Sequence, residues 1–154
     1  HTAISQPGMR YSQAESLIKS LMNDDIFRNL PLTERNAVTQ RILSDVRGRM
    51  LEDMVLLETK IARSECEVFK LLFDVGEFDM VVFNPETASC EIYEIKYSKE
   101  IVPQQTKHLL DEKKCMDTEF RYGTITGKYV LYRGESQMVD GVKYLNVEKY
   151  LKML

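Results

Sequence analysis

The runs Glu77-Phe-Asp-Met-Val-Val-Phe83 and Cys90-Glu-Ile-Tyr-Glu-Ile-Lys-Tyr97 decide the fold of this chain. Both runs are rich in β-branched and aromatic residues, which is typical of half-buried strands. Between them, Asn84-Pro-Glu-Thr87 is a turn signal. The segment therefore predicts two consecutive strands that pair with each other.

Charged residues lie in the middle of these largely apolar strands. Because side chains alternate between the two faces of a strand, Glu94 and Lys96 are expected on one face of the second run. In the first run, Asp79 is expected on the face of Val81 and Phe83. A buried charge without a partner is costly, so each of these groups needs one. Pairing of the strands predicts that Asp79 and Glu94 converge.

Two converging carboxylates repel each other unless a cation lies between them. Mg²⁺ prefers hard oxygen ligands and retains several waters. We expect Asp79, Glu94 and the backbone carbonyl of Ile95 to form part of an octahedral site for Mg²⁺ or Mn²⁺. Next to a bound phosphodiester, Lys96 would orient or deprotonate the attacking water, or stabilise developing negative charge. The alternative is a plain salt bridge between Glu94 and Lys96 on a solvated strand edge.

Helices are predicted before these strands. The expected segments are Tyr11 to Met22, Thr33 to about Val46, and about Arg49 to Ala62. Ser12 and Thr33 are the expected N-caps, and Gly48 permits a break or bend between the second and third helices. A strand is expected from about Glu67 to Phe73.

The third helix offers a further carboxylate. Its apolar residues follow the spacing of one buried stripe, namely Met50, Met54, Leu57 and Ile61. Glu52 lies at the edge of this stripe, and Glu58 lies nearer to it. Periodicity alone does not choose between the two glutamates.

After the strand pair, proline at position 103 opens a predicted helix to about Phe120, because proline is tolerated in a first turn. The remaining predicted elements are a loop at 122–127, a strand at 128–133, a turn at Asp140-Gly141, a strand at 142–147 and a closing helix at 148–154. The resulting order α-β-β-β-α-β predicts an α/β fold with a mixed sheet flanked by helices.

Bulk properties narrow the class of protein. A length of 154 residues fits one domain. The net charge of -3 counts modestly against a free-standing nucleic-acid-binding module, which is usually basic. The three cysteines form no CxxC pair, so they predict neither a zinc site nor a disulfide framework and favour reduced thiols in a cytoplasmic protein.

The ends of the chain and its hydropathy bear on location. No apolar stretch approaches the roughly 20 residues that span a membrane. The chain starts with His1 and shows no basic start followed by an apolar run, so no signal peptide is predicted. We expect the sequence to be an excised piece of a longer protein.

The pattern Gly48-Arg-Met-Leu-Glu52, Gly76-Glu-Phe-Asp79 and Glu94-Ile-Lys96 resembles the PD-(D/E)xK nuclease superfamily. In that superfamily, an acidic residue on the first core helix, an Asp on the second strand and an ExK motif on the third strand form the metal site. The resemblance implies Glu52, rather than Glu58, as the helix carboxylate. It implies Glu52, Asp79, Glu94 and Lys96 as the catalytic residues. No proline precedes Asp79, where Phe78 stands instead.

The resemblance also implies a restriction-endonuclease-like fold that hydrolyses phosphodiester bonds in nucleic acid. Residues 1–46 would form a linker and helical extension, and residues 47–154 the nuclease-like domain. More narrowly, the chain is similar to nuclease-like C-terminal domains attached to bacterial and archaeal AAA+-type ATPases, so an N-terminal ATPase domain is an expected partner. Family members often carry a Gln or a basic residue after the ExK strand, which makes Gln104, Gln105 and Lys107 candidates for substrate binding. A catalytically inactive module for binding or scaffolding is the alternative, since fold does not fix function.

Overall fold

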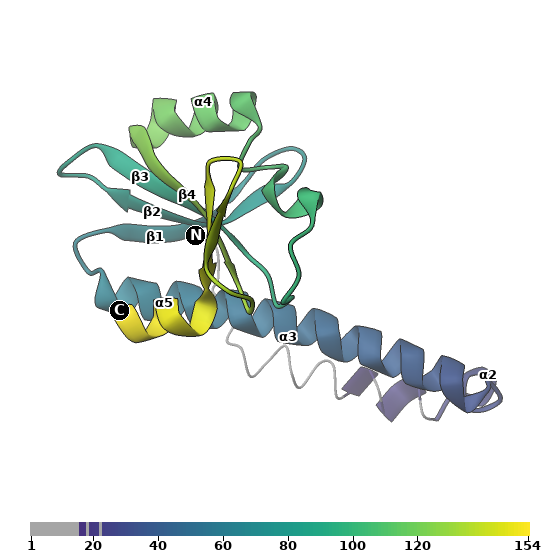
Figure 1. Ribbon diagram of the computed structural model, residues 1–154. Coiled ribbons are helices and arrows are strands. Elements are labelled where there is room, and N and C mark those ends of the chain that lie inside the picture. The colour runs from purple at the N-terminus through teal and green to yellow at the C-terminus, as the bar shows by residue number, and fades with distance from the viewer. Residues whose placement is uncertain (1–15, 18, 22) are drawn as a thin grey trace. The chain divides into compact units, whose positions relative to one another are not determined.

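The structure, a computed structural model, describes residues 16, 17, 19–21 and 23–154. In this part of the chain, five helices and a six-stranded mixed sheet make an α/β protein (Figure 1). The chain divides into two compact units, His1–Met54 and Val55–Leu154. No helix of the described part is long and apolar enough to cross a membrane.

The first unit is helical where it is described. Residues 16, 17 and 19–21 are helical, while the rest of the predicted Tyr11 to Met22 helix, including Ser12, lies outside the described residues. A short helix α2 (Asp25–Arg28) follows, and the Asp24 side chain caps it by accepting a hydrogen bond from the Phe27 N–H at 3.0 Å.

The two helices expected from Thr33 to Val46 and from Arg49 to Ala62 are one continuous helix, α3 (Leu32–Ala62). The predicted break at Gly48 is wrong, because an interior glycine costs a helix only about 1 kcal/mol. The predicted cap is also wrong. The N–H groups of Glu34 and Arg35 donate to the carbonyl of Pro31, so Thr33 lies inside the first turn.

The predicted buried stripe of the third helix is wrong as well. Met54, Leu57 and Ile61 are exposed, and α3 instead buries Leu51, Val55 and Thr59. These three residues also follow a helical spacing of four, so the periodicity of this segment permitted two stripes. In the second unit, the buried stripe is the one that contains Thr59, whose hydroxyl hydrogen-bonds the Tyr150 hydroxyl at 2.9 Å.

The sheet has the strand order β1-β2-β3-β4-β6-β5. Its strands are β1 (Glu67–Leu72), β2 (Glu77–Asn84), β3 (Ser89–Ile95), β4 (Thr124–Tyr132), β5 (Gln137–Val139) and β6 (Val142–Asn146). The first three strands pair antiparallel, whereas β4 runs parallel to both β3 and β6. The predicted mixed sheet is thus confirmed. The sequence did not indicate β5, a short strand that pairs antiparallel with β6.

The crossover from β3 to β4 differs from its prediction. Instead of one helix from Pro103 to Phe120, a 3-10 helix η1 (Pro103–Thr106) precedes a separate helix α4 (Glu112–Tyr122). The Asp111 side chain accepts a hydrogen bond from the Lys114 N–H at 3.1 Å and so starts the new helix. The predicted loop at 122–127 is mostly strand, because β4 begins to pair with β3 at Thr124.

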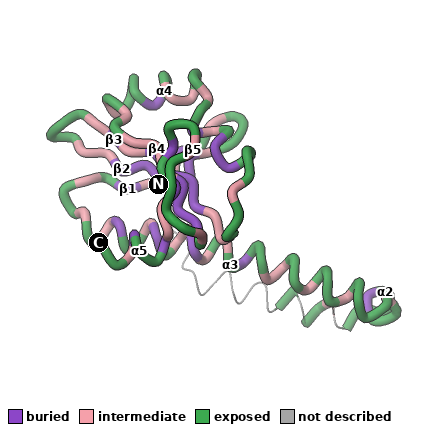
Figure 2. The backbone as a smooth tube through the Cα atoms, viewed as in Figure 1, coloured by how far each residue is buried: buried purple, intermediate pink, exposed green. Residues whose placement is uncertain are grey.

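Helices cover both faces of the sheet (Figure 1). On one face, Tyr122 of α4 packs against Phe69 and Phe83. On the other face, Tyr150 of the last helix, α5 (Val147–Met153), packs against Tyr93. The buried residues concentrate in the strands between these layers (Figure 2).

Candidate functional site

The local geometry of β2 sets the position of Asp79. In the pairing of β1 with β2, Phe69 lies opposite Val81 and Leu71 lies opposite Phe78, so β2 holds one residue more than β1 over this stretch. This is a β-bulge, and Asp79 lies in it. The bulge interrupts the alternation of side chains, and it places Phe78 and Val81 in the same core cluster. The expected placement of Asp79 by simple alternation with Val81 therefore does not hold.

The β2 and β3 strands part beside this bulge. Their paired residues end at Met80 and Tyr93. Beyond that point, the Ile95 N–H donates to Oδ2 of Asp79 at 2.7 Å. A side-chain carboxylate thus takes the place of a backbone acceptor, which satisfies a buried N–H that the ladder no longer serves.

Lys96 joins the two expected carboxylates. Its Nζ lies 2.9 Å from Oε2 of Glu94 and 3.4 Å from Oδ2 of Asp79. The backbone holds Lys96 in place, because its N–H donates to the Leu131 carbonyl of β4 at 2.8 Å. One ammonium therefore contacts both carboxylates where β2 and β3 part. We call Asp79, Glu94 and Lys96 the fork cluster.

Burial shifts the pKa values of the charged groups in the fork cluster. Asp79 and Glu94 are each only 3% exposed, whereas the Lys96 side chain is 35% exposed. Burial and repulsion by the Asp79 carboxylate raise the pKa of Glu94 to about 8, although the Lys96 ammonium opposes this shift. Burial alone would lower the pKa of Lys96, but attraction by the two carboxylates outweighs it and raises that pKa above its ordinary value.

One oxygen of the fork cluster is left without a hydrogen bond. Oε1 of Glu94 is buried, and no donor within the described part of the chain reaches it. Buried acceptors are normally paired, so an orphaned carboxylate oxygen needs an explanation. A hard cation is the kind of partner that such an oxygen binds well.

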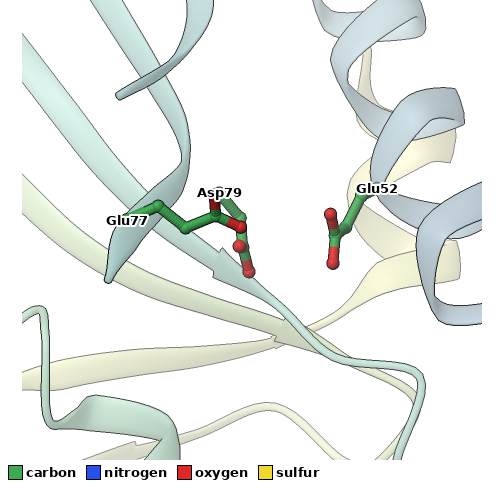
Figure 3. Close-up of side chains that lie close together, drawn as sticks. All are labelled: Glu52, Glu77 and Asp79. Atoms are coloured by element: carbon green, nitrogen blue, oxygen red, sulfur yellow. The ribbon is translucent and has the colours of Figure 1, made fainter. Parts of the chain in front are cut away.

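Glu77 is an acidic neighbour that the sequence argument did not propose. Carboxylate oxygens of Glu77 and Asp79 lie within 4.8 Å of each other, and Figure 3 shows both side chains. The Lys70 Nζ also contacts Glu77 Oε1 at 3.2 Å. Glu77 stands two residues before Asp79 on the same strand, and this spacing predicts that two side chains share one face of a regular strand. Glu52 lies on α3 in the first compact unit, and the candidate site consists of residues of the second unit.

The three candidate substrate-binding residues lie in and just after η1. Gln104 and Lys107 are exposed, and Gln105 is 5% exposed. Oε1 of Gln105 accepts hydrogen bonds from the Val102 N–H and the Tyr144 hydroxyl, and its Nε2 donates to the Glu100 carbonyl. Gln105 therefore ties η1 to β6, which leaves Gln104 and Lys107 as the accessible candidates.

Comparison with known proteins assigns no family to this arrangement. No family model matches the chain, and no curated protein matches it. The chemical reading of the site consequently rests on its own residues.

Proposed function

We propose that this chain is a metal-dependent nuclease-like domain that hydrolyses phosphodiester bonds in nucleic acid. The observation that carries the proposal is the fork cluster. Two buried carboxylates and one ammonium meet at the end of β3, where a bulge and a side-chain-to-backbone hydrogen bond hold them. Buried carboxylates are costly to hold in the ionised form, and such groups occur preferentially at functional sites.

The residues present fit Mg²⁺ or Mn²⁺. The donor atoms are carboxylate oxygens, which hard divalent cations prefer, and Glu94 Oε1 is buried without a hydrogen bond. We expect Asp79, Glu94 and the Ile95 carbonyl to hold the ion. A bound ion would neutralise phosphate charge and lower the pKa of a coordinated water.

The protein's own groups would then have distinct tasks. Asp79 and Glu94 would hold the ion, which would supply positive charge to the phosphodiester. Lys96, held next to both carboxylates, orients the attacking water and stabilises developing negative charge. The mixed sheet with its parallel β3–β4 pair is compatible with the restriction-endonuclease-like core that the sequence pattern implies.

The wider context of the domain follows from the sequence resemblance. On that basis the domain would be the C-terminal part of a cytoplasmic AAA+-type ATPase, which would be its partner within the longer chain. A P-loop and a Walker-B strand encoded upstream in the same open reading frame would support this attachment. A start codon near His1 would exclude it.

One observation favours a second candidate, a catalytically inactive module used for binding or scaffolding. Lys96 already neutralises part of the charge on Asp79 and Glu94, so the fork cluster is also a self-contained salt-bridge network. Such a network can persist for structural reasons after catalysis is lost.

Metal binding and cleavage, measured together, separate the two candidates. Calorimetric titration with Mg²⁺ and with Mn²⁺ should detect binding to the wild type and none to Asp79→Asn, which keeps the shape of the side chain but removes its charge. Asp140→Asn is the matched control, because Asp140 is an exposed residue in the turn between β5 and β6. Labelled DNA and RNA substrates, single-stranded and duplex, then test cleavage.

The cleavage assay needs the variant that leaves the carboxylates in place. Lys96→Gln should lower the cleavage rate by roughly 10²-fold or more if it handles the attacking water. Equal cleavage by wild type and Lys96→Gln would refute the mechanism. Metal binding without cleavage of any substrate would favour the catalytically inactive module.

A further inference from the structure

A second polar feature lies beside the fork cluster. A pocket of about 320 Å³ is formed by the tip of the β1–β2 hairpin, the turn before α4 and the first turns of α4. Its basic lining consists of Lys107, His108, Lys113 and Lys114. Phe73 and Val75 supply an apolar wall, and Val75 is 77% exposed.

The lysines of this pocket lack carboxylate partners. None of them takes part in an ion pair within the described part of the chain, although Asp74, Asp111 and Asp117 also line the pocket. The Asp111 carboxylate is used as the helix cap. The Nζ of Lys114 lies 2.7 Å from Nδ1 of His108 and 5.4 Å from the centre of the Phe73 ring.

The pocket adjoins the fork cluster through Gly76. This glycine has φ +83°, and a Cβ there would lie 2.4 Å from the His108 ring, so only glycine lets the ring pack on the backbone. Gly76 directly precedes Glu77, at the start of the strand that carries Asp79. Burial lowers the pKa of His108, and charge repulsion by Lys114, Lys107 and Lys96 lowers it further. Within the pocket, the Lys114 ammonium lies against the His108 ring.

Pocket lysines that form no ion pair in the described part of the chain offer ammonium groups to an anion. A phosphate group supplies acceptor oxygens for Lys107, Lys114 and the ring, and the apolar wall suits the sugar that follows a phosphate along a strand. The volume of about 320 Å³ is in the range of small-ligand pockets and exceeds the needs of a single ion.

We propose that this pocket binds a backbone phosphate of the nucleic-acid strand next to the bond positioned at the fork cluster, with Lys107 and Lys114 as the binding cations. The inference rests on the proposed function for its choice of ligand. It adds a substrate-positioning site that is separate from the metal-binding residues.

Salt-dependent binding tests the proposal without any catalysis. The full chain is titrated into fluorescein-labelled DNA and RNA oligonucleotides, single-stranded and duplex, in EDTA and over a range of NaCl concentrations. Lys107→Gln and Lys114→Gln are compared with Lys152→Gln, an exposed lysine on α5 that pairs with no carboxylate in the described part of the chain.

The expected result is a loss in both pocket variants and none in the control. Each pocket variant should weaken binding about tenfold. Each should also reduce the slope of log K against log salt by about 0.9 for a B-DNA duplex or about 0.7 for a single strand. Lys107→Gln is the safer variant, because Lys107 makes no side-chain contact of the kind that links Lys114 to His108 and Phe73.

Three outcomes would overturn the proposal: no binding of any oligonucleotide, equal salt slopes for the pocket variants and the control, or displacement by inorganic phosphate at an equal concentration of phosphate groups. The last would show an anion site with no preference for a strand. Failure of the proposed function looks different. Binding that depends on Lys107 and Lys114, in a wild type that never cleaves in Mg²⁺, would retain the pocket and exclude the catalysis.

Discussion

Replacing Lys96 by methionine tests the central electrostatic claim in the absence of metal. The change keeps most of the alkyl stem and removes the ammonium that contacts Asp79 and Glu94. Removing one partner of a buried ion pair costs about 3–5 kcal/mol. Since the Lys96 side chain is 35% exposed, solvent compensates part of the loss, and we expect about 2–3 kcal/mol at a pH above that of Glu94 ionisation.

Urea unfolding in EDTA measures this loss. The chain has no tryptophan, and every tyrosine except Tyr11 lies in the second unit, so near-UV circular dichroism of tyrosine follows the unit that holds the fork cluster. Lys149→Met is the control, because its ion pair with Glu135 is exposed on both sides and should contribute nothing measurable. If Lys96→Met were as stable as Lys149→Met, the carboxylates would not need the ammonium and the electrostatic account would be wrong.

Three further predictions concern the pKa of Glu94 and the glycines at positions 123 and 48. The pKa of Glu94 is about 8 in the folded protein, against an ordinary value of 4.5, so the folded state keeps a proton that the unfolded chain releases. The free energy of unfolding therefore falls by at most about 1.4 kcal/mol per pH unit as pH rises between those values. Urea unfolding across that range should show a flatter pH dependence for Glu94→Gln, and equal slopes would contradict the shift. Gly123→Ala should destabilise the protein by roughly 2 kcal/mol or more in thermal unfolding, because φ is +77° and the new Cβ would lie 1.8 Å from the Ala88 carbonyl oxygen. The control is Gly141→Ala, which has a similar φ but no atom within 4 Å of the new Cβ, and it should cost only about 1 kcal/mol. Gly48→Ala should stabilise α3 by about 1 kcal/mol and slow its amide hydrogen exchange, because alanine has the higher helix propensity and nothing lies within 4 Å of the new methyl group. Unchanged exchange would argue that this helix turn is not formed in solution.

The sequence predicted those parts of the fold that local pattern controls. The content of β-branched and aromatic residues, with the Asn84 turn, located β2 and β3 to within a few residues. The crossover between a strand pair and a later strand predicted a mixed sheet. Three charges in apolar strands also predicted that Asp79, Glu94 and Lys96 meet, because each would be too costly to bury alone.

Elements that depend on tertiary contacts or on competing local signals were not predictable in the same way. The capping carboxylate of Asp111 divides a segment whose composition suits one long helix. Segment 124–127 is polar and glycine-containing, yet it becomes strand because β3 offers it a partner. On α3, two apolar stripes satisfied the periodicity equally, and only packing selects Val55 and Thr59 over Leu57 and Ile61.

The bulge at Asp79 explains why fold and site are difficult to separate by mutation. Oδ2 of Asp79 accepts the buried Ile95 N–H, so the residue holds β2 and β3 together whether or not a cation binds. Asp79→Ala would leave that N–H without a partner, at a cost of about 1–3 kcal/mol, and lost activity could then reflect a disturbed strand pair. Asp79→Asn retains one acceptor oxygen for the Ile95 N–H, removes the charge and replaces the other oxygen by an NH2 group. Asparagine is therefore the substitution whose effect on metal binding can be attributed to chemistry.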